Sequence, residues 1–376
     1  MSDFREQFAD FGETTYLNCA YQGPFPLATA ARVREAIELK CRPERMKPPE
    51  YFDLPERVRT SLAKITGADE EEIALTSGAT EGIGVAAAGL HLDAGDEVIV
   101  ADSNFPCNLF TWLYLRRRDV RVHVLKTGGK PVQPDDVARV VTPRTKVLAL
   151  DWVGYSSGAR IDLAALGEIA HRHGALFVVD GTQGVGALAL DLHQLPVDVL
   201  AVAAYKWLLG PYGSGFVYVK REVLNQLDLP VVNWLSVNGA EDFDSLPVEE
   251  FALPRAARIF DAAETANFLN LYALDASLCF VVGAGVQTVT NHCTRLLQCA
   301  TEGLRAKGYR VSAGDGARLA STILTFSGSS DEATARLHAN LKAEHVEVSL
   351  RHGMIRVSPY LYNNEDDVMR LLEIAP

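Results

Sequence analysis

Residues 175–183 read ALFVVDGTQ, a short apolar run that ends in Asp180 and is followed by a glycine and two polar residues. A run of this length, rich in β-branched and aromatic residues and closed by a turn, is typical of a buried strand. Ligands of parallel α/β sheets bind where the strands end, so Asp180 is a candidate functional carboxylate. It would need a partner there, because an unpaired buried charge is costly. An Asp-Gly pair is equally typical of a helix N-cap, and this stretch alone leaves both interpretations open.

The next apolar run, at 199–203, leads into YKWLLGP at 205–211. Lys206 therefore follows a predicted strand and precedes a Gly-Pro turn. A lysine in this setting is either a surface residue with a partly covered stem or a buried amine, and burial favours the neutral, reactive form. Its place one strand after Asp180 favours the buried, reactive interpretation.

A third stretch, LTSGATEG at 75–82, predicts a strand that turns at Gly78 into a helix. The first N–H groups of a helix have no intrahelical partner, so a turn of small residues there can bind an anion such as phosphate. Capping of the helix by Thr76 or Ser77 would give the same pattern. The stretch lacks the lysine of a P-loop and is not the GxGxxG of a dinucleotide-binding fold.

Apolar runs and amphipathic helical patterns alternate from about residue 60 to residue 220. This alternation predicts an α/β fold in which helices flank a mostly parallel central sheet. After residue 260 the pattern predicts a long helical region at 264–306 and then a small α+β unit. We expect a large domain at 19–255 and a small domain built from 1–18 and 256–376. The predicted strands of the large domain lie at 72–75, 97–100, 120–125, 146–151, 175–180, 199–203 and 215–219.

The chain has 376 residues, with 36 Lys and Arg against 48 Asp and Glu, and a formal net charge of −12. This acidity argues against nucleic acid or an anionic membrane surface as a partner, because both reward positive charge. The most apolar stretch, 278–286, is too short to span a membrane, and no signal peptide is visible at the start. The six cysteines form no CxxC pair. We therefore expect free thiols, no metal site and a cytoplasmic location.

Together the three stretches match what pyridoxal 5'-phosphate requires of a protein. A carboxylate keeps the ring nitrogen protonated, a lysine binds the cofactor covalently, and a helix N-terminus binds the phosphate. Their order resembles that of the class V aminotransferase family, the fold-type I pyridoxal-phosphate enzymes that include cysteine desulfurases and isopenicillin N epimerase-like proteins. The resemblance extends to shorter motifs, YLNCA at 16–20, GARIDL at 158–163, FDAAETANF at 260–268 and RVSP at 356–359.

The resemblance implies a role for each matching residue. Lys206 is implied as the Schiff-base lysine and proton shuttle, and Asp180 as the partner of the ring nitrogen. Arg356 is implied as the arginine that binds the substrate α-carboxylate, the alternative being a strand residue whose head lies in water. The segment 260–267 implies a homodimer in which Thr265 reaches the partner subunit's cofactor. The other implied cofactor-binding residues are Gly78, Ala79, Thr80, Phe105 (stacked on the ring), Gln183 (on the phenolic oxygen) and Tyr205, and the other candidate substrate-binding residues are Tyr21 and Tyr155.

The chain departs from the desulfurase pattern at several positions. Phe105 and Tyr205 stand where desulfurases carry histidine, and Tyr155 stands where they carry asparagine. No cysteine occurs from residue 331 to residue 376, although desulfurases carry their persulfide cysteine on a loop in this part of the chain. A protein-bound persulfide therefore lacks its thiolate carrier.

These departures favour transamination or a specialised reaction at a C–S or C–N bond. We predict an aminotransferase-like enzyme that acts on an amino acid through a Lys206 aldimine and a quinonoid intermediate. A C–S or C–N lyase, an epimerase or a desulfurase-like enzyme would use the same residues, so these reactions stay open. A non-catalytic regulatory protein on the same fold is disfavoured by the joint presence of Lys206, Asp180 and Arg356. A nucleotide-binding oxidoreductase is disfavoured because no predicted strand is followed by GxGxxG.

Overall fold

The fold is organised around a seven-stranded sheet of order β2-β8-β7-β6-β5-β3-β4. A computed structural model of the chain describes residues 4–47, 50–229, 231–242, 244–246, 248–265, 268–312 and 321–376. Neighbouring strands from β7 to β4 pair in parallel, whereas β8 pairs antiparallel with both β7 and β2. The predicted mostly parallel sheet is therefore confirmed. Its strands are β2 (Ile73–Thr76), β3 (Glu97–Ala101), β4 (Arg121–Leu125), β5 (Thr145–Asp151), β6 (Leu176–Asp180), β7 (Val199–Ala203) and β8 (Gly215–Val219).

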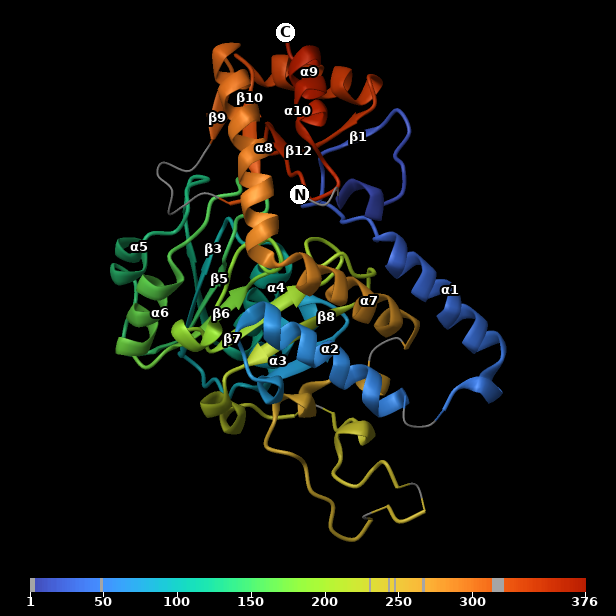
Figure 1. Cartoon of the computed structure of the whole chain (residues 1–376). Coiled ribbons are helices and arrows are strands. Elements are labelled where there is room, and N and C mark those ends of the chain that lie inside the picture. The colour runs from blue at the N-terminus through green and yellow to red at the C-terminus, as the bar shows by residue number, and fades with distance from the viewer. Residues whose placement is uncertain are drawn as a thin grey trace.

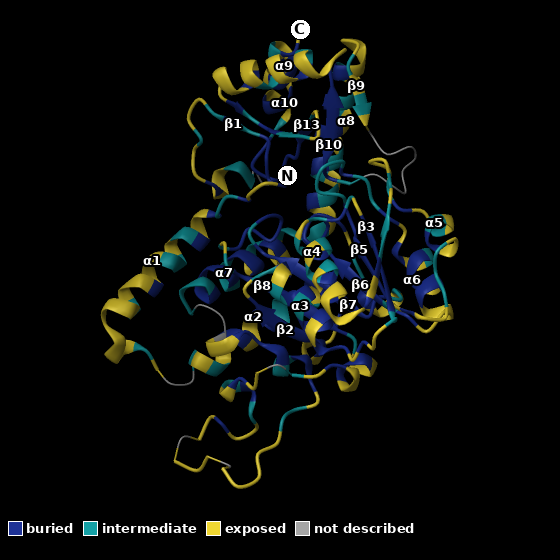
Figure 2. Ribbon diagram, turned by 180° about the vertical axis from the view of Figure 1, so that it is seen from behind, coloured by how far each residue is buried: buried dark blue, intermediate teal, exposed yellow. Residues whose placement is uncertain are grey.

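Both faces of this sheet are covered, because its strands are apolar on both sides. In β6, Phe177 and Val179 face a core shared with α2, α6 and α7, whereas Val178 faces a core shared with α3 and α4. Figure 2 shows the buried strands between helices whose outer surfaces are exposed. The helices of this part are α1 (Leu27–Cys41), α2 (Glu50–Thr66), α3 (Ala79–Gly89), α4 (Cys107–Leu113), α5 (Pro134–Ala138), α6 (Leu163–Arg172) and α7 (Phe268–Ala284).

A second sheet, of order β12-β13-β10-β9 and antiparallel throughout, packs with α8, α9 and α10 (Figure 1). Both ends of the chain contribute to this part of the molecule. β1 (Thr15–Tyr16) pairs in parallel with β11 (Val346–Glu347), and Asn18 forms a bridge with Ser358. The remaining elements are α8 (Val286–Ala306), β9 (Arg310–Ser312), β10 (Leu324–Ser327), α9 (Asp331–Ala343), β12 (Ser349–Arg351), β13 (Met354–Val357) and α10 (Glu365–Ile374).

The predicted long helical region at 264–306 is two helices rather than one. α7 ends at Ala284, α8 begins at Val286, and the two are bent by 74°. Gly285 between them has a φ of 80°, a left-handed conformation that costs little in a residue without a side chain. From this bend α8 runs from the large sheet to the small one (Figure 1). The division into two domains near residue 255 stays a prediction.

A buried ion pair ties α2 to the edge strand β2. Two nitrogens of Arg59 donate to the two carboxylate oxygens of Asp261, at 2.8 and 2.9 Å. Both side chains are 4% exposed. One of these oxygens also accepts the backbone N–H of Leu75 at 2.8 Å. The pair therefore anchors the strand that leads into the N-terminus of α3.

Two sequence expectations concern features spread along the chain. All six cysteines are free thiols, as expected. Within the described ranges, no single helix is long and apolar enough to cross a membrane. Only α7 and α8, which are bent against each other, have the required length and composition when they are counted together.

Candidate active site

Asp180 and Lys206 lie in one cavity at the carboxyl end of the central sheet. Asp180 is the last residue of β6, and Lys206 follows the end of the neighbouring strand β7. Both are buried, with 4% and 5% of their surface exposed. We call this cavity, of about 220 Å³, the inner cavity, and an adjoining one of about 300 Å³ the outer cavity. Of the predicted residues, the inner cavity is lined by Gly78, Ala79, Thr80, Phe105, Tyr155, Asp180, Gln183, Tyr205 and Lys206, and the outer cavity by Tyr21, Phe105, Tyr155, Gln183, Tyr205, Lys206 and Arg356.

The amine of Lys206 has a lowered pKa, so it loses its proton at a lower pH than the amine of a solvated lysine does. Burial lowers its pKa from 10.5 to about 8, with the Asp180 carboxylate opposing the fall and the Arg356 guanidinium adding to it. The Nζ atom lies 5.3 Å from the centre of the Phe105 ring and 5.5 Å from that of Tyr205. A substantial neutral fraction near physiological pH lets this amine act as a nucleophile or a base.

The Asp180 carboxylate is held by two donors inside the cavity. Its Oδ1 accepts the backbone N–H of Thr182 at 2.9 Å, and its Oδ2 accepts the thiol of Cys107, with Sγ at 3.4 Å. The Thr182 hydroxyl in turn accepts the N–H of Ala203 at the end of β7. These bonds fix the carboxylate between β6 and β7. The sequence argument missed Cys107 and Thr182, which also line the inner cavity.

A second carboxylate, Asp151, lies beside Asp180 and was also missed. It ends β5 directly opposite Asp180 in the sheet register. Its oxygens accept the backbone N–H of Phe105 at 2.6 Å and the side-chain amide of Asn108 at 3.0 Å. Burial and the Asp180 charge raise the pKa of Asp151. Asp151 thus builds the turn that carries Phe105, and its signal in the sequence was the same strand-ending aspartate that marks Asp180.

The N-terminus of α3 opens onto the inner cavity. Gly78 is its N-cap residue, has a φ of 151°, and offers no side chain to cap this helix end. The neighbouring backbone is also tightly packed, because a Cβ on Gly215 would lie 2.7 Å from the Gly78 Cα. First-turn N–H groups without a side-chain cap can bind an anion such as a phosphate.

Arg356 contributes a buried cation to the outer cavity. It is 2% exposed. Its guanidinium donates to the backbone carbonyl of Tyr155 at 2.5 Å and to the Ser349 hydroxyl at 3.4 Å, and its Nε is buried without a partner. Burial, together with the charge of Arg351, lowers the pKa of Arg356 to about 10. No carboxylate of the described residues forms an ion pair with it, so an anionic ligand would supply the missing partner.

The rings of Phe105 and Tyr155 line both cavities, and the His352 ring contacts Tyr155 from outside them. The rings of Phe105 and Tyr155 lie edge to face with centres 5.2 Å apart, and the Tyr155 hydroxyl lies 3.0 Å from Nε2 of His352. His352 is at the tip of the β12–β13 hairpin. The hairpin therefore brings the end of the chain to the mouth of the outer cavity.

The N-terminal segment seals the cavity from the other side. The N–H of Gly23 donates to the Tyr205 carbonyl at 2.9 Å, and a Cβ on Gly23 would lie 2.1 Å from the Lys206 carbonyl oxygen. The side-chain amide of Gln183 donates to the Ala20 carbonyl at 3.0 Å and accepts the Trp207 indole N–H at 2.9 Å. Both ends of the Gln183 amide are thus held by the protein at the cavity wall.

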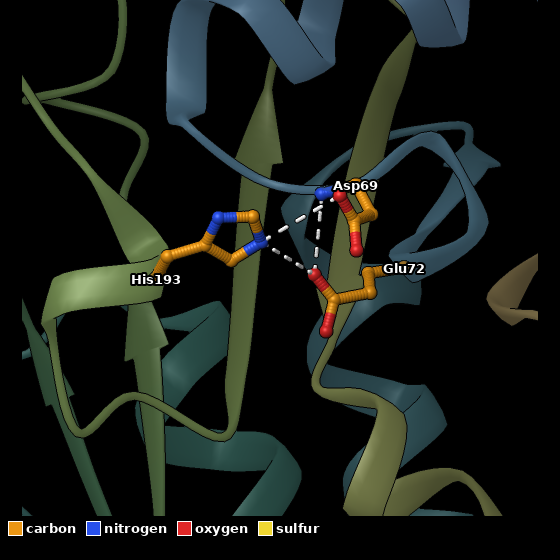
Figure 3. A group of neighbouring side chains, drawn as sticks. All are labelled: Asp69, Glu72 and His193. Atoms are coloured by element: carbon orange, nitrogen blue, oxygen red, sulfur yellow. Dashed lines mark hydrogen bonds and ion pairs between the residues drawn. The ribbon is translucent and has the colours of Figure 1, made fainter.

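Two further points concern Thr265 and a possible metal site. The side chain of Thr265 lies outside the described residues. The described residues contain one group that could hold a metal ion, Asp69, Glu72 and His193, which Figure 3 shows around the turn before β2. It lies outside both cavities, and the Glu72 oxygens already accept the backbone N–H groups of Asp69 and Arg221, at 3.2 and 3.1 Å.

The family model described as Aminotransferase class-V matches residues 50–371, which is most of the chain. The chain belongs to the class-V aminotransferase family. Isopenicillin N epimerase from Amycolatopsis lactamdurans is 29% identical to this class-V enzyme over 98% of the chain and 96% of the relative. A probable cysteine desulfurase from Pseudomonas putida is 31% identical over 83% of the chain and 79% of that relative. Another, from Methanothermobacter thermautotrophicus, is 29% identical, but the match covers only 63% of the chain and 58% of that relative.

Solved structures show the same fold. The cystine C–S lyase C-DES, in complex with cysteine persulfide, superimposes with a TM-score of 0.86 at 20% identity, covering 96% of this chain and 97% of that one. The cysteine desulfurase CsdA from Escherichia coli gives a TM-score of 0.81 at 24% identity, and the match covers 99% of this chain and 96% of that one. The class-V enzyme therefore has the fold of the fold-type I pyridoxal-phosphate enzymes, as predicted.

The enzyme depends on pyridoxal 5'-phosphate, and its cavity fits that cofactor. The inner cavity offers a buried amine at Lys206, a buried carboxylate at Asp180 and the uncapped N-terminus of α3. These are the groups that a covalently bound, ring-protonated phosphate ester needs. The substrate of such an enzyme is an amino acid.

Proposed function

We propose that this enzyme is a lyase that breaks a C–S or C–N bond of an amino acid, without storing sulfur on the protein. The comparisons support this alternative better than the aminotransferase-like reaction favoured by the sequence, because most of the matching relatives are named as cysteine desulfurases or isopenicillin N epimerases, and one is named as an uncharacterised aminotransferase. The observation that carries the proposal is the hairpin at 349–357. Its turn consists of only His352 and Gly353, both with positive φ, and neither the hairpin nor the rest of residues 331–376 contains a cysteine.

The thiols that lie near Lys206 do not replace that missing cysteine. Cys19 is buried, and burial raises its pKa. Burial and the Asp180 carboxylate also raise the pKa of Cys107. Both are therefore neutral thiols near pH 7, and a neutral thiol is a poor nucleophile toward sulfur. A sulfur leaving group would pass to solvent or to a small acceptor.

In the proposed reaction, Lys206 takes the Cα proton of the substrate, and the bond from Cβ to the leaving atom breaks. The bound cofactor supplies an electron sink for this step. Arg356 holds the α-carboxylate, which orients the Cα–H bond. Asp180 keeps the ring nitrogen protonated, and Phe105 stacks on the ring. We further propose that Gly78, Ala79, Thr80 and Tyr205 bind the phosphate, Gln183 the phenolic oxygen, and Tyr21 and Tyr155 the substrate.

We also propose that the enzyme is a homodimer in which Thr265 reaches the partner subunit's cofactor. An exposed apolar segment near Thr265 in the sequence supports this proposal, because such surfaces are usually covered. Sedimentation of the purified enzyme tests it, and a monomer at micromolar concentration would contradict it. The exposed apolar residues of the segment are Val231, Val232, Trp234, Leu246, Val248 and Phe251.

Product analysis tests the lyase proposal. Incubation with cystine, cysteine or other amino acids bearing a β leaving group should release a keto acid and ammonia in equal amounts, with no keto-acid acceptor present. Lys206→Ala should abolish both products and the borohydride-trapped adduct with the cofactor. Keto acid formed only with an acceptor would identify an aminotransferase instead.

Epimerisation is the second candidate, because the isopenicillin N epimerase matches almost the whole of both chains. Incubation in deuterated water distinguishes it from elimination. An epimerase would return the intact amino acid with deuterium at Cα and a mixed configuration. A lyase would consume the amino acid.

A further inference from the structure

The outer cavity carries more positive charge than one carboxylate requires. Its lining includes Lys206, Arg351 and Arg356, whereas no aspartate or glutamate is found among its described lining residues. This excess contrasts with the net charge of −12 on the whole chain. A concentration of cations in an acidic protein attracts anionic ligands selectively.

Arg351 is placed beside Arg356 by the register of the hairpin. Ser349 lies opposite Arg356, and Arg351 lies opposite Met354. Residues two apart on a strand share a face, so Arg351 and Arg356 are diagonal neighbours on one face of the sheet. The lowered pKa of Arg356 has the Arg351 charge among its causes.

The Arg351 charge lacks a partner in the described part of the chain. One of its nitrogens donates to the carbonyl of Leu350 at 2.9 Å, and no described carboxylate forms an ion pair with it. It is half-buried in the lining of the outer cavity, and the repulsion between its charge and that of Arg356 is among the causes of the lowered Arg356 pKa. An anion that bridges both would remove this repulsion.

We infer that the substrate is an amino acid with a second carboxylate on its side chain, which Arg351 binds while Arg356 binds the α-carboxylate. This inference rests on the proposed function, which assigns the α-carboxylate to Arg356. Diagonal neighbours on a sheet have backbones roughly 7–8 Å apart, and ligands of several lengths test how far apart the two guanidinium groups hold the two carboxylates. Tyr21 and Gln22, which line the same cavity, offer neutral donors to the second carboxylate.

The test compares dicarboxylates with monocarboxylates of equal length. Calorimetry on the holoenzyme would measure binding of succinate, glutarate and adipate against butyrate, valerate and hexanoate. We expect the best dicarboxylate to bind at least about tenfold more tightly than the monocarboxylate of equal length, because one additional charged hydrogen-bonded pair contributes about that much affinity. Arg351→Gln should reduce this ratio to about twofold or less, and Arg351→Lys should keep part of it.

A matched control is Arg305→Gln, which removes one charge from the exposed end of α8. It should leave the ratio unchanged. Equal affinity for the two ligand series in the wild-type enzyme would overturn the inference, as would a preference that survives Arg351→Gln.

Because no turnover is involved, this experiment is separate from the product analysis. If dicarboxylates are preferred through Arg351 but no keto acid and ammonia form, the proposed reaction fails and the substrate class stands. If keto acid and ammonia form but dicarboxylates are not preferred, the second-carboxylate inference alone fails.

Discussion

The thiol of Cys107 donates a hydrogen bond to Asp180, with Sγ 3.4 Å from Oδ2. The bond places a neutral sulfur beside the carboxylate proposed to pair with the cofactor ring. Because burial and the Asp180 charge raise the pKa of Cys107, little thiolate is present at neutral pH. A thiol held in this way is a poor nucleophile, which is consistent with the proposed role of the cavity.

Cys107 should therefore react slowly with alkylating reagents. With iodoacetamide at pH 8, we expect the exposed Cys41 to be labelled at least about tenfold faster than Cys107, because only thiolates attack and Cys107 is also partly covered. Mass spectrometry of peptides at several times would measure both rates. In urea the two rates should converge, and equal rates in the folded enzyme would contradict the prediction.

The lowered pKa of Lys206 predicts how cofactor capture depends on pH. Below about pH 8 the amine is mostly protonated and unreactive, and above it the amine is neutral. The rate at which the apoenzyme takes up pyridoxal phosphate covalently should therefore rise through pH 7 to 8 and level off by about pH 9. Stopped-flow absorbance would follow it. A rate that keeps rising to pH 10.5, as for a solvated lysine, would show that burial does not tune this amine.

Replacing Arg356 should separate substrate binding from stability. Arg356→Gln should weaken the binding of α-carboxylate ligands by roughly tenfold to a hundredfold, because charged hydrogen bonds are lost. Its melting temperature should stay equal or rise, because the wild-type enzyme buries a cation that lacks a carboxylate partner. Calorimetric binding and thermal unfolding would measure the two effects. A fall of several degrees would indicate that Arg356 stabilises the fold.

Gly23 should tolerate no side chain. A Cβ there would lie 2.1 Å from the Lys206 carbonyl oxygen, so Gly23→Ala should destabilise the enzyme by about 1–3 kcal/mol and displace the lysine loop. Gly84→Ala is the control, because a Cβ at Gly84 in α3 meets no atom within 4 Å. That variant should be neutral or gain about 0.5–1 kcal/mol from helix propensity. Urea unfolding would measure both, and equal stabilities would refute the close packing at Gly23.

The sequence predicted the strands of the central sheet well, because most of them are short apolar runs buried on both faces, the edge strand β4 being the exception. The predicted strands at 199–203 and 215–219 agree with β7 and β8 to the residue. The break at Gly285 was not predicted, because two glycines within an apolar helical pattern, Gly283 and Gly285, do not by themselves specify a 74° bend. Register is equally hidden in a single sequence.

Some residues of the candidate site could likewise be predicted from the sequence, and others could not. Asp180 and Lys206 could be predicted because each follows its own strand, and neighbouring strand ends meet. Asp151 ends a strand too, but its partner Phe105 comes from a turn much earlier in the chain. The contact between Cys107 and Asp180 joins residues far apart in sequence, and no local pattern marks it. Contacts of this kind depend on how the layers pack.

The N-terminal segment has a consequence for how the enzyme is made. Thr15 pairs with Val346, and Gly23 seals the loop of Lys206. A ribosome therefore releases the first of these partners long before it has synthesised the last. The central sheet and the contact of Gly23 with the lysine loop can form during translation, but the N-terminal segment is held at both of its contacts only after synthesis has passed β11. The nascent chain should consequently complete the outer cavity, which Arg351 and Arg356 line, only after most of its hydrophobic core is already in place.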